Sequence, residues 1–249
     1  MSIGIREHPL SFSDFLDLER KTLKALHKNS TIQTEFPNIY NPASAKAFAG
    51  NGANGRRTQR FQKFGFECCW NSVCEFEGGS DCRLILQEQV TPDKNSDRVR
   101  DVTFCLCVAL LENKAIKRVL RKFHFDFTLD TGETRRRRHP IHHAQYGGKA
   151  GGDLGGHLDE EMLAHLTPAL SEPRVFYYPM TLAIALSLGF REFQNEHTKV
   201  VLESADWLNV VRENESRVIR PFLVSFVDSI NSRKGRDTLF DFLYTQEIN

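Results

Sequence analysis

The sequence predicts an α+β fold, and three observations lead to that class. Apolar and polar residues alternate in short runs between about residues 64 and 146, as they do in antiparallel strands. Helical signals precede this stretch over residues 11–28 and return after it over about 158–245. Strands followed by helices, rather than strict alternation, are typical of a mainly antiparallel sheet in an α+β arrangement. Because no repeat and no clear linker interrupts the chain, we expect residues 1–249 to form a single domain.

The first helix is predicted from a capping motif. Ser11-Phe-Ser-Asp14 resembles a capping box with an acid at its fourth position, which favours a helix over residues 11–28. An approximate apolar stripe supports this helix: Phe15, Leu18, Leu23 and Leu26. Prolines and a glycine cluster then predict an irregular segment over residues 30–60.

The strands are predicted from side-chain alternation. Short strands are expected at Phe64/Phe66 and at Arg83–Val90. Residues 102–111 are apolar at nearly all odd-numbered and even-numbered positions, which is typical of a central strand covered on both sides. Residues 117–129 alternate, with phenylalanines on one face and polar side chains on the other: Lys122, His124, Asp126 and Thr128. The turn at 130–133 would return the chain as a strand through Tyr146, and Pro140 would make it an edge strand or a bulge.

Helices are expected in the C-terminal part. Asp159 begins a short helix, and Pro179 opens a second one with an apolar stripe. Ser204 begins a third helix, which Pro221 is expected to split or kink, and Asp237 caps a last helix through residue 243.

The most unusual stretch of the chain is the run from Arg135 to Tyr146, which contains four arginines and three histidines. Residues 114–149 contain ten Lys/Arg against three acids, whereas residues 150–249 contain nine against fifteen. This asymmetry indicates either a local anion-binding surface or an attraction between the two parts, and both interpretations remain open.

The proposed return strand predicts a cluster of polar side chains. A two-residue loop at Thr131-Gly132 would place Asp126 opposite Arg137 and His124 opposite His139, whereas a three-residue loop would shift this register by one. Arginine binds phosphate in a bidentate manner, and histidine transfers protons near neutral pH. The expected anion-binding residues are Arg135, Arg136, Arg137, Arg138, Arg118, Arg121, Lys122 and Tyr146, and the expected proton carriers are His139, His143 and Asp126. The alternative is a solvated edge strand whose charge prevents aggregation.

Other motifs predict less. His142 and His143 would point to opposite faces of a strand, and nearby arginines would repel a cation, so no metal site is predicted and no particular cofactor is implied. The six cysteines contain no C-x-x-C pair and are expected to be reduced. The glycine-rich residues 147–156 match no phosphate-binding motif, so an anion nest and a mobile loop both remain open. The absence of an apolar leader or a spanning stretch leads us to expect a cytoplasmic protein.

A short motif resembles that of prokaryotic proteins of uncharacterised function. The motif is His139-Pro140-x-x-His143-x-Gln145-x-Gly147, followed by the helix entry at Pro179–Leu186. The resemblance covers about residues 115–195. It implies a bacterial protein of a mobile-element or phage-defence locus and supplies no reaction.

Three hypotheses follow from the sequence. The first is binding of nucleic acid, RNA or DNA, or another polyanion through the basic hairpin. The second is a metal-assisted or histidine-based phosphodiesterase or nuclease that uses Asp126, His139 and His143. The third is a protein–protein interaction subunit, or a homo-oligomer, in which the basic hairpin meets an acidic surface.

Overall fold

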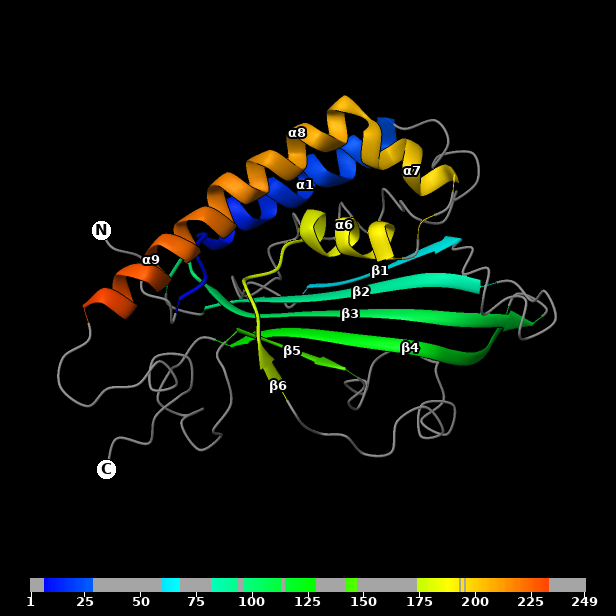
Figure 1. The fold of residues 1–249 in the computed structure, drawn as a ribbon, viewed down its shortest axis with the longest axis horizontal. Helices are drawn as coiled ribbons and strands as arrows, with labels where there is room; N and C mark the ends of the chain where they lie inside the picture. The colour runs from blue at the N-terminus through cyan, green and yellow to red at the C-terminus, as the bar shows by residue number, and fades with distance from the viewer. Residues whose placement is uncertain are drawn as a thin grey trace, which may run out of the picture.

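The structure, a computed structural model, describes residues 7–28, 60–67, 82–93, 96–112, 115–128, 142–146, 174–192, 194 and 196–232. These residues form two layers, an antiparallel sheet and a set of helices that covers one of its faces (Figure 1). The order of elements is one helix, then strands, then helices, which confirms the predicted α+β class. None of the described helices is both long and apolar enough to cross a membrane.

The sheet has six strands, and each pairs with the next along the chain in antiparallel orientation. Its strands are β1 (Arg60–Glu67), β2 (Cys82–Pro92), β3 (Val99–Glu112), β4 (Ala115–Thr128), β5 (His142–Tyr146) and β6 (Arg174–Phe176). The predicted limits of 64–146 were too narrow, because β1 begins at Arg60 and β6 adds an edge strand beyond β5.

The described helices are α1 (Phe12–Lys28), α6 (Leu182–Glu192), α7 (Glu196–Glu203), α8 (Ala205–Asn214) and α9 (Arg220–Asn231), with a π turn, η2 (Glu215–Ile219), between the last two. Two predicted caps are confirmed. The Ser11 hydroxyl accepts from the Asp14 amide at 3.1 Å, and the Ser204 hydroxyl accepts from the Trp207 amide at 3.3 Å. The prediction missed α7, and the helices expected at 159 and at 237–243 lie outside the described residues.

The helix that begins at Ala205 continues past Pro221 instead of ending there. Proline has no amide hydrogen to donate to the preceding turn, and the backbone widens into η2 just before it. Pro221 then lies in the first turn of α9, where a missing donor costs little. The predicted split is therefore a local π turn within one long helical element, which Figure 1 shows running along α1.

The core lies between the helices and one face of the sheet. Phe104 of β3 and Phe15 of α1 are fully buried, as are Leu182, Leu186 and Phe190 of α6. Three consecutive β3 residues, Phe104–Leu106, are buried, which agrees with a central position of this strand in the sheet. The Phe123/Phe125/Phe127 face of β4 was correctly predicted to face the core, since all three pack in or against the buried apolar cluster.

The register of β4 against β5 differs from the one expected. Asp126 pairs with His143, not with Arg137, and His124 pairs with Gln145, not with His139. The predicted register, which assumed a two-residue loop at Thr131-Gly132, is therefore wrong. The described strand begins at His142, beyond Pro140, which has no amide hydrogen to donate to a ladder. The partner of Asp126 moves by an even number of positions, from 137 to 143, so His143 falls on the face that was predicted for Arg137.

Candidate functional site

Two rows of residues, most of them polar, share the register positions of the sheet face opposite the core. One row runs across four strands through Gln89, Thr103, Asp126 and His143, which are paired in the register. The adjacent row runs through Gln87, Cys105, His124 and Gln145. Because directly opposed residues in antiparallel strands share a face, these rows place an acid and two imidazoles next to each other.

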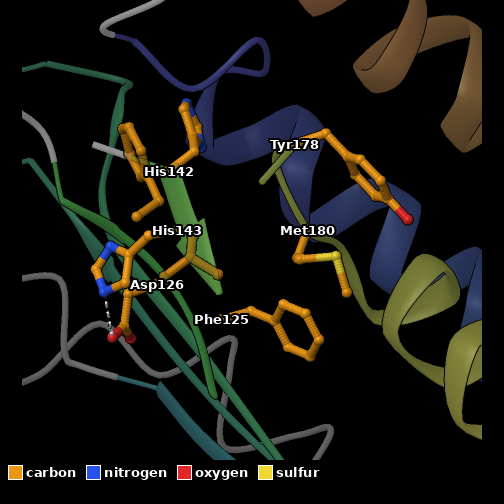
Figure 2. Close-up of a pocket in the computed structure, with 8 residues that line it drawn as sticks. Phe125, Asp126, His142, His143, Tyr178 and Met180 are labelled. Atoms are coloured by element: carbon orange, nitrogen blue, oxygen red, sulfur yellow. Dashed lines mark ion pairs between the residues drawn. The ribbon is translucent and has the colours of Figure 1, made fainter. Parts of the chain in front are cut away.

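Asp126 is the centre of this polar face. One carboxylate oxygen, Oδ1, accepts from the Thr103 hydroxyl at 2.8 Å and lies 3.1 Å from His124 Nε2. The other, Oδ2, lies 3.3 Å from His143 Nε2, the ion pair drawn in Figure 2. Asp126 is 22% exposed and His124 16%, whereas His143 is only 4% exposed. The accessible edge of the cluster is therefore formed by Asp126 and His124.

The contacts around Asp126 fix its charge. Burial would raise the pKa of Asp126, but the hydrogen bonds and charges of His124 and His143 outweigh it and hold this pKa well below its usual range. Burial likewise opposes charge on His124, and the hydrogen bond and charge of Asp126 reverse that effect and raise the pKa of His124. The carboxylate is thus ionised at neutral pH and stabilises the imidazolium form of its neighbour.

The core face at the same strands has a different chemistry. His142 lies one residue before His143 and points to the opposite side, where its ring stacks on Phe127 at 4.6 Å and meets Phe222 edge-on at 5.2 Å. This confirms that the two neighbouring histidines do not converge. His8, from the segment before α1, lies 6.5 Å from His142 between ring centroids. Burial lowers the pKa of both residues, that of His8 to about 4, so both are neutral at pH 7.

A small cavity separates these two environments. Figure 2 shows Asp126 and His143 on one side of the strands and Phe125, Met180 and Tyr178 on the other. The cavity is lined by Val102, Phe125, Asp126, Phe127, His142, His143, Tyr178 and Met180. Its lining on the core side is mainly apolar and aromatic, whereas Asp126 and His143 line it from the polar face.

The structure places some of the predicted site residues and not others. Asp126 and His143 are brought together. Lys122 lies on the same face of β4 as His124 and Asp126 and is 4% exposed. Arg118 and Arg121 pair with Leu110 and Val108 in β3, and Tyr146 pairs with Phe123; nothing further is described of their side chains. His139 and Arg135–Arg138 lie outside the described residues. Among the neighbouring aromatic residues, Phe176 stacks on Phe222 and Phe226, and Tyr177 packs on Phe125.

Sequence reasoning missed Thr103 and understated His124. Thr103 lies within the apolar run 102–111, where a single hydroxyl gave no reason to expect a contact with Asp126. The sequence did contain one signal. Thr103 lies between the apolar Val102 and Phe104, so in a strand its side chain points to the face opposite theirs.

The arrangement is suited to proton transfer and to anion binding. A buried carboxylate that accepts from an imidazole orients the ring and favours its charged form. Among the described residues, no group of three or more His, Cys, Asp or Glu side chains is arranged to hold a metal ion.

No protein-family model matches this chain, and searches of curated proteins and of solved structures found no significant match.

Proposed function

We propose that this protein binds a phosphate-bearing ligand, with nucleic acid as the first candidate, at the polar face of its sheet. The observation that supports this most is the position of Asp126 between His124 and His143, at 3.1 and 3.3 Å. This contact raises the pKa of His124 and so favours its charged, donating form, and Lys122 lies on the same face of β4. Cationic donors of this kind bind phosphate oxyanions.

The arginine run supports an extended ligand. Arg138 precedes His142 by four residues in the sequence, and a segment of that length spans at most about 14 Å. Arg135 precedes His142 by seven residues, which span at most about 25 Å. All four arginines therefore lie within that length of chain from the start of β5, whose second residue contacts Asp126. Several phosphates of one nucleic acid strand can engage such a set of cations, and each contact adds to the salt dependence of binding.

Cleavage of a phosphodiester is the second candidate, and one contact favours it. Asp126 holds two imidazoles at once, which supplies an acid and a base within one cluster, as hydrolysis of a phosphodiester requires. His143 is the residue that we assign to proton transfer, with Asp126 orienting its ring. His139 remains a predicted second proton carrier.

The test is a single incubation of purified protein with labelled RNA and DNA, with and without Mg²⁺ or Mn²⁺, followed by native and denaturing gels. We expect a native shift that weakens steeply between 50 and 200 mM salt, by at least about tenfold for several phosphate contacts. Replacement of Arg135–Arg138 by Ala should abolish the shift. A matched control removes four exposed cations from the helical layer (Arg20→Ala, Lys24→Ala, Arg191→Ala, Lys199→Ala) and should leave the shift in place.

The same gels separate binding from cleavage. Shortened label on the denaturing gel, lost in His143→Ala while circular dichroism remains that of the wild type, would support the phosphodiesterase candidate. An intact label with a salt-sensitive shift supports binding alone. A label that neither shifts nor shortens would refute the nucleic-acid proposal and favour the third hypothesis, a subunit that meets a protein partner. We place this activity in the bacterial cytoplasm, where the resemblance to prokaryotic proteins would assign it to a defence or mobile-element system.

A further inference from the structure

Helix α9 exposes an apolar stripe on the side away from the core. Leu223, Val224 and Val227 are 49%, 53% and 50% exposed, which is unusual for three large aliphatic side chains within five residues. The opposite side of the same helix packs on the core, where Phe222 is buried against His142 and Phe176. The exposed stripe is therefore additional to the apolar side that attaches α9 to the fold.

The position of α9 leaves this stripe accessible. α9 continues the long helical element beyond the N-terminal end of α1, at the margin of the helical layer (Figure 1). Four of the six exposed positions of α9 follow the 4-3-4 spacing of a helix-pairing seam: Arg220, Val224, Val227 and Asn231. Such a spacing matches the a and d positions at which two helices pack side by side.

Two charges flank the stripe in a self-complementary way. Arg220 lies four residues before Val224 and Asp228 lies four residues after it, and both are exposed. Neither residue has an ion-pair partner within the part of the chain that the structure describes. If two α9 helices pack antiparallel about a two-fold axis at Val224, Arg220 of each copy lies opposite Asp228 of the other. A parallel pairing would set like charges against each other instead.

We propose that α9 is a homodimer interface in which a second copy of this chain covers the Leu223/Val224/Val227 stripe in antiparallel orientation. The apolar side chains supply the attraction, and the two Arg220–Asp228 pairs select the orientation. Because the stripe is short, we expect a weak and reversible dimer.

The first experiment measures the molar mass of the full chain by light scattering over a range of concentrations. We expect the mass to rise from 28.5 kDa toward twice that value as the concentration increases. Val224→Glu should raise the dimer dissociation constant by at least about tenfold, because it places a charge in the apolar seam. The matched control is Val200→Glu on α7, since Val200 is 50% exposed and lies outside this stripe. That control should dimerise as the wild type does.

A charge reversal tests the orientation. Arg220→Glu and Asp228→Arg should each weaken the dimer several-fold, because each creates like-charged pairs. The double variant should restore the wild-type constant, which a merely structural effect of either change would not do. The proposal is overturned if the full chain stays monomeric at every concentration, which would leave the stripe to a segment of the same chain or to a different partner. It is equally overturned if Val224→Glu dimerises normally, or if the double variant is weaker than both single variants.

Discussion

Replacing His8 by Phe should remove much of the acid sensitivity of this fold. His8 is fully buried, its ring meets Phe15 and Phe127 edge-on at 5.3 and 5.5 Å, and its Nδ1 accepts from the Leu10 amide at 3.3 Å. Desolvation lowers its pKa to about 4 in the folded chain, against 6.5 for an exposed imidazole. A phenylalanine keeps the aromatic contacts and cannot be protonated.

The sign and size of the effect follow from proton linkage. The unfolded chain binds a proton at His8 more readily than the folded chain does, so the stability is complete above pH 6.5 and decreases as the pH falls toward 4. Between pH 7 and pH 5 the loss from this residue alone is about 2 kcal/mol. His142 contributes in the same direction, since its pKa is also lowered by burial and by the charge of His8. His124 contributes in the opposite direction, because its pKa is raised.

Urea unfolding at pH 7 and pH 5, at one ionic strength, measures this difference. His8→Phe removes the contribution of His8 and also the charge that lowers the pKa of His142, so we expect the pH-dependent loss to be smaller by at least about 2 kcal/mol in the variant. Loss of the Leu10 hydrogen bond costs about 1 kcal/mol at both pH values and does not affect the comparison. Phe15→Leu is the matched control, because it alters the same aromatic cluster without removing a titrating group. An equal loss in the wild type and in His8→Phe would refute the reasoning.

Three further outcomes are expected. Asp126→Asn should lower the pKa of His124, followed by NMR titration of its ring, because the charge and the hydrogen bond that raise it are both removed; an unchanged titration would show that the contact does not exist in solution. Phe104→Ala should reduce the free energy of unfolding by about 3–5 kcal/mol, measured in urea, since the ring is fully buried at the centre of the sheet. Ser204→Ala should cost about 1 kcal/mol in the same assay, because the Trp207 amide loses its cap at the start of α8.

The fold class and most elements were predictable because they depend on local patterns. The alternation of Phe123, Phe125 and Phe127 identified the core face of β4, and Ser11 and Ser204 identified two helix starts. Strand β6 was missed because three residues are too few to show alternation. Helix α7 was missed because its eight residues follow α6 closely, so its pattern is difficult to separate from that of the preceding helix.

The candidate site was predictable by residue but not by pairing. Asp126 and His143 were both singled out, yet the contact between them depends on where β5 begins, and no local pattern fixes the length of the connection after Thr128. The face of the sheet on which Asp126 and its partner lie was nevertheless predicted correctly, because the observed partner, His143, is an even number of residues from the predicted one, Arg137. His8 gave no signal at all, because its burial depends on contacts with Phe127 and His142, which are distant in the sequence.

The pKa values of the histidines on the two faces of the sheet are shifted in opposite directions. On the core face the pKa of His142 is lowered, while on the polar face the pKa of His124 is raised. The ionisable side chains that the structure describes around His124 on that face include Asp126, Lys122, Cys105, His143 and Asp101, and burial raises the pKa of Asp101. Acidification from pH 8 to pH 6 therefore adds positive charge to the polar face while the core histidines remain largely neutral.

An oligonucleotide without terminal phosphates should consequently bind more tightly at pH 6 than at pH 8, at constant ionic strength, because its internal phosphodiesters do not titrate in this range. His124→Asn should remove most of this pH dependence, since it deletes the group whose pKa the contact with Asp126 raises. His8→Phe serves as the control and should keep the pH dependence, because His8 lies in the core. If His124→Asn binds with the wild-type pH profile, the cation that attracts the phosphate is not His124, and the polar cluster around Asp126 is a structural feature of the sheet.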